Sequence, residues 1–227
     1  MLETKQSKVM EFLYELGRIV GVTSGIPFQL LFFKSKIYHE TKKKKGRFKG
    51  GKLIISNHYN LLDYVLGCFI VYPRKLNAVA SELPYKSKIT RFGMKFFGTV
   101  QANRESRSMR FIDQSVDLIK KGQLVQIYPE GRNTPDGNIH PFKHSYLAIA
   151  YRANCPIVPV ITDGNYGIFK RARVIIGDEI DVMPFFTPGR RTPPREELER
   201  ANEYVFAKVL ELRERIEEEK KKEKGQK

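Results

Sequence analysis

From residue 50 onward, short apolar runs alternate with longer segments of helical periodicity, and this alternation restricts the possible folds more than any other feature. Strands are expected at residues 52–56, 76–80, 99–102, 123–128, 157–161 and 173–176, and helices at about 62–72, 86–97, 106–120 and 144–153. Strands separated by helices of this length predict an α/β fold, with a mixed, largely parallel sheet covered by helices on both faces.

The same patterns divide the chain into three predicted parts. Residues 1–33 form an N-terminal amphipathic and apolar helical segment, residues 34–193 form the α/β domain, and residues 194–227 form a C-terminal helix. The helical spacing of the first part is carried by Val9, Phe12, Leu13, Leu16, Ile19 and Val20. We expect the charged end of the C-terminal helix to be frayed and exposed.

The first part also bears on membrane binding. Its longest charge-free run, 19–33, is shorter than the roughly 20 apolar residues that a spanning helix needs. The run suits a segment that lies in the membrane interface, or one that is buried in the core. Three early glutamates interrupt the apolar residues before it, so no signal peptide is expected.

The charge balance favours an anionic partner. Lys and Arg number 41 against 25 Asp and Glu, a formal net charge of +16. Nucleic acid, an anionic membrane face and phosphorylated substrates all fit such a surplus. Basic residues gather between Lys34 and Lys52, with a run at 42–45; a solvated loop is the plain interpretation. Beside the aromatic segment 28–33, however, such a run resembles the pairing that holds proteins to anionic lipid.

Cysteine and histidine usage indicates neither disulfides nor a metal. Cys68 and Cys155 both lie in apolar surroundings, and two cysteines provide no disulfide framework in a chain of 227 residues. A reduced, cytosolic setting follows. The four histidines show no ligand spacing with cysteines or carboxylates, so no metal is predicted, and His140 and His144 are interpreted as surface residues.

His58 and Asp63 lie five residues apart, at the junction of a predicted strand and a predicted helix. A carboxylate that holds one ring nitrogen of a histidine leaves the other free to take a proton from a hydroxyl. Five residues of regular helix would place the two side chains roughly 140° apart. The pair can therefore act as a dyad only if His58 stands outside the helix, at the turn. In isolation the pair is weak evidence.

Three further pieces follow predicted strands or precede predicted helices. The segment 128–134 contains Glu130, Gly131 and Arg132 at the end of a strand, where open α/β sheets place ligands. Gly131 allows close approach of backbone, and Arg132 can fork onto a phosphate; a plain polar turn is the alternative. Arg104 and Lys143 precede helices, as phosphate anchors or as ordinary surface cations.

Taken together and in this order, these pieces resemble the motifs of the glycerolipid acyltransferase family (PlsC-like, with an HxxxxD motif). Asn57, His58 and Asp63 match its first block, N-H-x-x-x-x-D, and the stretch that ends at Arg104 is similar to its second. Residues 128–134 resemble its third block, F-P-E-G-T-R-S, although Arg132 follows Gly131 without an intervening threonine. Residues 156–160 are similar to its fourth, a V-P-V strand.

The resemblance implies transfer of a fatty acyl group from acyl-CoA or acyl-carrier protein to the free hydroxyl of a lysophospholipid, most commonly lysophosphatidate. His58 would be the base and Asp63 its partner. Glu130, Gly131 and Arg132, with Arg104 and Lys143, would bind the acceptor. The acyl donor is a co-substrate, and no cofactor is implied. Backbone N–H groups near Gly131 or at a helix start are expected to stabilise the oxyanion.

The predicted location is the cytoplasmic face of an anionic membrane, as a peripheral or monotopic protein. Another lysophospholipid or a polyol head group stays open as the acceptor. So does a different class of protein, which binds anionic lipid or nucleic acid without catalysis. Nucleic acid is not the expected partner, because the chain shows no module in which aromatic residues are interleaved with Lys and Arg.

Overall fold

The computed structural model describes residues 2–41, 48–81, 98–102, 109–134, 136–190 and 192–225. Its strands are β1 (Lys36–His39), β2 (Lys52–Ser56), β3 (Leu76–Ser81), β4 (Val100–Ala102), β5 (Leu124–Ile127), β6 (Ile157–Thr162) and β7 (Arg173–Ile176). Its helices are α1 (Leu2–Ser24), α2 (Ile26–Phe28), the π-helical turn η1 (Gln29–Phe33), α3 (Leu62–Val71), α5 (Arg110–Lys120), α6 (Ser145–Ala153), the 3₁₀ turn η3 (Met183–Phe185) and α7 (Arg195–Gly225).

The strands form one sheet in the order β1-β7-β6-β2-β5-β3-β4. Every neighbouring pair is parallel except β6 and β7, which are antiparallel. The predicted mixed, largely parallel sheet is therefore confirmed. Because β2, β5 and β6 run in the same direction, the three polypeptide segments that follow them leave the sheet at one edge, here called the carboxyl edge.

Six strands were expected, and each lies within one or two residues of its predicted range. The seventh, β1, falls in the segment interpreted as a basic loop, and that interpretation is wrong for residues 36–39. They pair in parallel with β7 at the border of the sheet. The expected helix at 86–97 and the lysine run at 42–45 lie outside the described residues, as does the start of the helix expected at 106–120.

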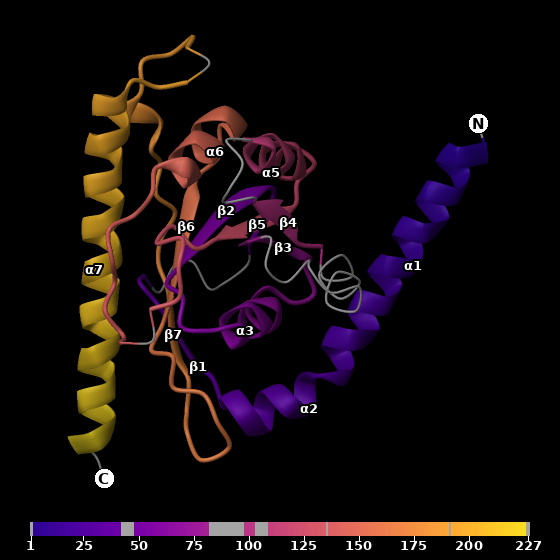
Figure 1. Cartoon of the computed structure of the whole chain (residues 1–227). Coiled ribbons are helices and arrows are strands. Elements are labelled where there is room, and N and C mark those ends of the chain that lie inside the picture. The colour runs from indigo at the N-terminus through magenta and orange to yellow at the C-terminus, as the bar shows by residue number, and fades with distance from the viewer. Residues whose placement is uncertain are drawn as a thin grey trace.

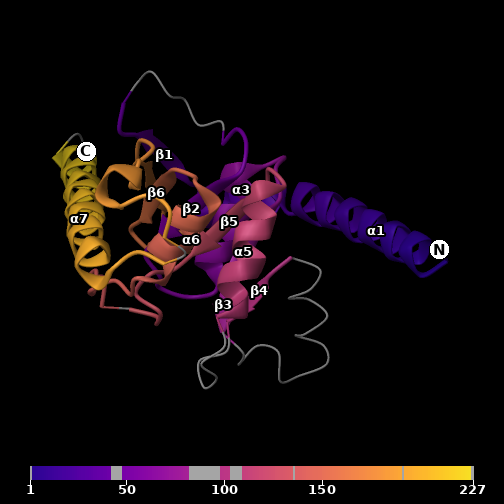
Figure 2. The ribbon, with the colours of Figure 1, turned by 90° about the horizontal axis from the view of Figure 1, so that it is seen from above.

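Helices cover both faces of the sheet. Helices α5, α6 and α7 pack on one face, and α3 with η1 packs on the other (Figures 1 and 2). Strand β2 contributes side chains to the hydrophobic clusters on both faces of the sheet. Leu53 and Ile55 belong to the cluster under α5–α7, and Ile54 belongs to the cluster under α3. This follows from the two-residue period of a strand, and it explains why β2 is apolar throughout its centre.

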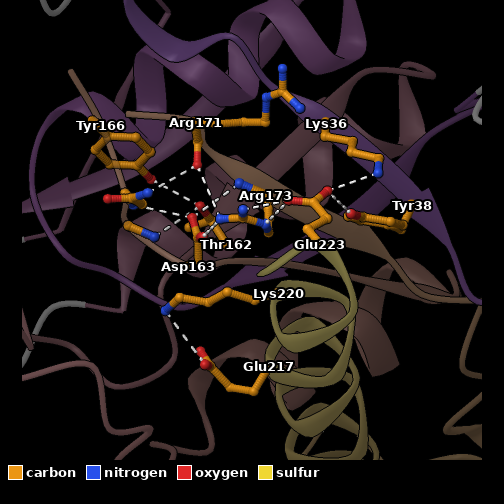
Figure 3. A network of polar contacts seen from close by, with 12 residues as sticks. Lys36, Tyr38, Thr162, Asp163, Tyr166, Arg171, Arg173, Glu217, Lys220 and Glu223 are labelled. Atoms are coloured by element: carbon orange, nitrogen blue, oxygen red, sulfur yellow. Dashed lines mark hydrogen bonds and ion pairs between the residues drawn. The ribbon is translucent and has the colours of Figure 1, made fainter. Parts of the chain in front are cut away.

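Helix α7 runs along the sheet beside β6 and β7 (Figure 1). Apolar side chains at helical spacing form its inner face: Ala201, Val205, Val209, Leu212 and Ile216 are buried, and Leu198 is partly buried. The expectation that its charged end is frayed is wrong. The helix continues to Gly225, and Glu223 accepts hydrogen bonds from Lys36 Nζ (2.7 Å), Tyr38 Oη (2.8 Å) and Arg173 Nε (3.0 Å), as Figure 3 shows. The C-terminal turns of α7 are therefore bound to both β1 and β7.

Helix α1 has a different character. Figures 1 and 2 both show it projecting away from the sheet, and its apolar side chains are exposed: Val9, Phe12, Leu13, Leu16, Ile19 and Val20. Among the described residues, one helical stretch, Glu15–Phe33, is long and apolar enough to cross a membrane by length and composition. Only 17% of it is buried, so it is not a core helix. This stretch is longer than the charge-free run at residues 19–33, because it begins at Glu15.

Replacement of Glu223 by Gln tests how the end of α7 is held. Two cations and one hydroxyl around this carboxylate, Lys36 foremost, lower the pKa of Glu223 from its usual value near 4.5 to about 2. Hydrogen bonds to charged groups contribute roughly 1.5–3 kcal/mol each, and Glu223 is partly exposed, so the Tm at pH 7 should fall by about 3–6 °C. Glu219→Gln, which affects only a pair with Lys222 on the same helix, should change the Tm far less.

The pH dependence of this difference has a definite sign. A carboxylate whose pKa is lowered in the folded state stabilises it fully above the unfolded pKa, near 4.5, and loses this effect as the pH falls through the folded value of about 2. The gap in Tm between Glu223→Gln and the wild type should therefore shrink over that range. A gap that stayed constant down to pH 2 would contradict the proposed ion pairing.

Candidate active site

The turn after β2 is held to β6 by the side chain of Asn57. Its Nδ2 donates to Thr162 O (2.9 Å), and its Oδ1 accepts from Thr162 N (3.0 Å). Both groups are buried, so each would be left without a partner if Asn57 were absent. This pairing extends the contact of β2 with β6 beyond Ser56 and fixes where the chain leaves the sheet. Asn57 is therefore a structural residue of the first motif, a role that the sequence did not reveal.

His58 and Asp63 face each other across that turn. Helix α3 begins at Leu62, so His58 lies outside the helix, as a dyad requires. His58 Nδ1 lies 2.9 Å from Asp63 Oδ2, which also accepts the backbone N–H groups of Tyr59 and Asn60, both at 2.7 Å. The Asp63 side chain is only 1% exposed, and a carboxylate so deeply buried needs donors of this kind.

This arrangement determines which ring nitrogen of His58 is available. A carboxylate oxygen accepts a hydrogen bond from an Nδ1–H, so Nδ1 carries the hydrogen and Nε2 carries the lone pair. In the part of the chain that the structure describes, no residue hydrogen-bonds Nε2. The imidazole stacks on the ring of Tyr128, with 4.0 Å between centroids, and 19% of the side chain is exposed. Nε2 is therefore suited to meet a proton donor from outside.

Tyr166, which the sequence analysis did not single out, completes the surroundings of Asp63. Its hydroxyl donates to Asp63 Oδ1, and it lies 3.2 Å from Thr162 Oγ1. Burial, reinforced by the Asp63 charge, raises the pKa of Tyr166 far above its usual range, so the hydroxyl keeps its proton. Tyr166 follows β6 by four residues, and the only sequence signal for it is this position at the carboxyl edge.

The third motif meets the first through Thr134. The backbone N–H of Thr134 donates to His58 O (2.7 Å), and its hydroxyl lies 3.2 Å from His58 O and 3.1 Å from Glu130 Oε2. Glu130 is 4% exposed, and its Oε2 also accepts the backbone N–H of His140 (3.0 Å). Its Oε1 is buried and has no hydrogen-bond partner among the described residues. That oxygen therefore keeps an unused acceptor position inside the site.

Two exposed cations lie beside Glu130. Gly131 has a φ of +67°, and a Cβ built there would lie 2.9 Å from Lys143 Cε and Nζ, so a glycine is needed for Lys143 to approach. Arg132 Nη2 lies 2.8 Å from His140 Nδ1. His140 thus contacts this cluster, while its side chain stays 31% exposed at the surface. The Gly131 N–H donates to Tyr128 O (3.0 Å), so this one N–H group is already engaged, and the oxyanion donors expected near Gly131 or at a helix start stay a prediction.

Arg104 lies outside the described residues, so its predicted place beside this site stays a prediction. Within the described ranges, no group of three or more His, Cys, Asp or Glu side chains could hold a metal ion. Cys68 and Cys155 are free thiols in the core, and burial raises the pKa of each to about 11. A thiol so poorly ionised at neutral pH is a weak nucleophile.

Comparison with known proteins agrees with this site. Residues 34–163, more than half of the chain, match the sequence profile of the Acyltransferase family. The chain belongs to this family. The crystal structure of the 1-acyl-sn-glycerophosphate acyltransferase PlsC from Thermotoga maritima shares the fold, with a TM-score of 0.57, 22% identity and coverage of 91% of this chain and 82% of that one.

Two relatives show the range of similarity. Human 1-acyl-sn-glycerol-3-phosphate acyltransferase beta is 32% identical over 114 residues, which cover 48% of this chain and 40% of the human one. The 1-acyl-sn-glycerol-3-phosphate acyltransferase of Bacillus subtilis is 22% identical over 173 residues, which cover 74% of this chain and 84% of the bacterial one. The chain thus spans less than half of the human relative and most of the bacterial one.

Replacement of Tyr166 by Phe tests how Asp63 is held. The change removes the donor to Asp63 Oδ1 and leaves a buried carboxylate oxygen unpaired, which should lower the free energy of unfolding by about 1–3 kcal/mol. Tyr72→Phe is the matched control, since the Tyr72 hydroxyl meets Thr23 at an exposed site. Urea denaturation measures both, and equal stability of the two variants would contradict the role assigned to Tyr166.

Proposed function

We propose that this protein transfers a fatty acyl group from a thioester, acyl-CoA or acyl-carrier protein, to the free hydroxyl of lysophosphatidate, which gives phosphatidate. One observation supports this above others: Asp63 holds His58 through Nδ1 and leaves Nε2 free, at the same sheet edge as the exposed cations Arg132 and Lys143. The relatives support the acceptor, because they are 1-acyl-sn-glycerol-3-phosphate acyltransferases.

The proposed reaction needs a base and no covalent enzyme intermediate. The acceptor hydroxyl oxygen attacks the thioester carbonyl carbon while His58 Nε2 takes the hydroxyl proton. Asp63 stabilises the imidazolium that forms, because its Oδ2 lies 2.9 Å from Nδ1. The tetrahedral intermediate then collapses, the carbon–sulfur bond breaks, and the thiolate leaves with the proton from Nε2. His58 returns to its starting state.

The acceptor would be held by the Glu130 cluster. The single free hydroxyl of lysophosphatidate gives its proton to His58, so Glu130 acts through the turn that it orders: its Oε2 accepts from the Thr134 hydroxyl and from the His140 N–H. Arg132 and Lys143, both exposed and adjacent to Glu130, bind the phosphate oxygens. Arg104 is proposed as a further phosphate contact on the strength of the family motif alone.

The proposed location is the cytoplasmic face of an anionic membrane, where the protein would be peripheral or monotopic. The exposed apolar side chains of α1 support membrane binding, and the net charge of +16 supports an anionic surface. A membrane location also suits the substrate, because a lysophospholipid resides in the bilayer.

His58→Ala tests the proposed base. General base catalysis contributes typically 10²–10⁴-fold, so kcat for transfer of labelled acyl groups to lysophosphatidate should fall by about that factor. His39→Ala is the matched control, because His39 lies at the end of β1 furthest from the carboxyl edge. Equal rates for His58→Ala and the wild type would sink the mechanism.

Arg132→Ala and Lys143→Met test recognition of the phosphate. Loss of one charge-assisted contact should raise the KM for lysophosphatidate about tenfold in each variant. The KM for the acyl donor, and that for an uncharged monoacylglycerol acceptor, should stay nearly constant. Lys120→Met removes an exposed cation of α5 as a control. An equal rise in KM for both acceptors would show that these cations do not bind the phosphate.

A further inference from the structure

The loop between β6 and β7, residues 163–172, ends in a tip that is apolar and fully open to solvent. Ile168 is 58% exposed and Phe169 is 99% exposed. Folding normally buries such side chains, and an exposed apolar site of this kind marks a surface that binds a partner.

This loop lies against the end of the N-terminal apolar segment. Gly167 N donates to Phe32 O (3.1 Å), Ala172 N donates to Phe33 O (2.8 Å), and the Tyr166 ring meets the Phe33 ring edge-on at 5.3 Å. Figure 1 shows the loop beside α2 at the lower end of the molecule. The same segment also exposes Phe28 (47%), Leu30 (63%) and Leu31 (64%). Apolar side chains from two distant parts of the sequence therefore adjoin each other.

Exposed cations lie next to both groups of apolar side chains, the loop tip and residues 28–33. Lys170 and Arg171 follow Phe169 directly, and Lys34 follows Phe33. Figure 3 shows the Arg171 side chain directed away from the ion-pair network, to which only its backbone carbonyl contributes. An apolar tip between cations matches an anionic lipid surface, in which acyl chains lie beneath phosphate groups. It does not match the apolar surface of another protein, where the cations would be left unpaired.

The loop is already ordered for such a contact. Asn165 Nδ2 donates to Arg171 O (3.2 Å), Arg173 N donates to Asp163 Oδ1 (3.0 Å), and Lys170 N donates to Gly167 O (2.9 Å). These bonds close the loop at its base and behind its tip. Insertion of the tip would therefore need little additional ordering of the backbone.

We propose that Ile168 and Phe169 form a second membrane contact, distinct from α1, which inserts into an anionic phospholipid bilayer beside residues 28–31. Tyr166, in the same loop, holds Asp63, so seating of the tip in the bilayer fixes the distance of the His58–Asp63 pair from the lipid surface. The insertion stands on the contacts above, whereas its use in acyl transfer rests on the proposed function.

Phe169→Trp provides a direct readout, because the chain contains no tryptophan. With vesicles of phosphatidylcholine and phosphatidylglycerol, the emission of this full-length variant should shift to the blue and be quenched by lipids brominated in the acyl chains. Tyr204→Trp is the control: Tyr204 is 44% exposed on α7, at the opposite side of the molecule from α1, and its emission should not change. If Phe169→Trp floats with the vesicles and its emission is unchanged, α1 binds alone and the proposal is wrong.

Two further outcomes would also overturn the proposal. One is the absence of any vesicle binding by the protein at low salt. The other is a blue shift with monomeric lysophospholipid below its micellar concentration that equals the shift with vesicles, because the tip would then hold a single acyl chain. A blue shift that requires vesicles and is largest with phosphatidylglycerol supports insertion.

The double variant Ile168→Ser, Phe169→Ser tests whether insertion of the tip supports acyl transfer at the membrane. Its partition onto the anionic vesicles should fall by roughly 10²–10⁴-fold, as expected for loss of two buried apolar side chains. Its acyl transfer to lysophosphatidate in vesicles should fall in parallel, while transfer to a water-soluble short-chain acceptor stays at the wild-type rate. Equal losses with both acceptors would place the defect in the active site and overturn the coupling. A wild type without transferase activity would refute the proposed function and leave the fluorescence test of insertion intact.

Discussion

The buried carboxylate of Asp63 sets the conditions that the rest of the site has to meet. Only 1% of its side chain is exposed, and four protein donors hydrogen-bond it in place of water: His58 Nδ1, two backbone N–H groups of the turn, and the Tyr166 hydroxyl. A charge in such a place is tolerated only when protein donors replace its hydration. The turn after β2 and the loop after β6 must therefore meet at Asp63, and the two hydrogen bonds of Asn57 with Thr162 hold the strands in the register that allows it.

The strands and the edge that carries the site could be predicted from the sequence, because β2, β5 and β6 are buried on both faces and each is followed by polar residues. Strand β1 could not. Two of its four residues are exposed, and its hydrogen-bond partners lie on β7, far along the chain. Its other support, the bond from Lys36 to Glu223, joins residues 187 positions apart. A contact of that span depends on where α7 packs, and no local pattern contains this information.

The same reasoning separates the site residues that were predicted from those that were missed. His58, Asp63, Glu130, Gly131, Arg132 and Lys143 belong to local motifs with recognisable chemistry, and the structure brings all six to one edge of the sheet. Tyr166 acts through a partner 103 residues away, and Thr134 joins two motifs that are 76 residues apart. Their importance comes from loop geometry at the carboxyl edge. A tyrosine or threonine in a loop carries no mark of such a role.

The single antiparallel pair in the sheet has a consequence for where the lipid would lie. Because β7 runs against β6, it starts at the carboxyl edge, and β1, parallel to β7, starts there too. The end of the apolar N-terminal segment is thereby delivered to the same edge as His58, together with the loop that contains Tyr166 and Phe169. A parallel β7 would have required a crossover, and its start would have lain at the opposite edge. Strand direction alone thus places the end of the apolar segment, Lys34 and His58 on one side of the molecule, where a single bilayer could meet all three.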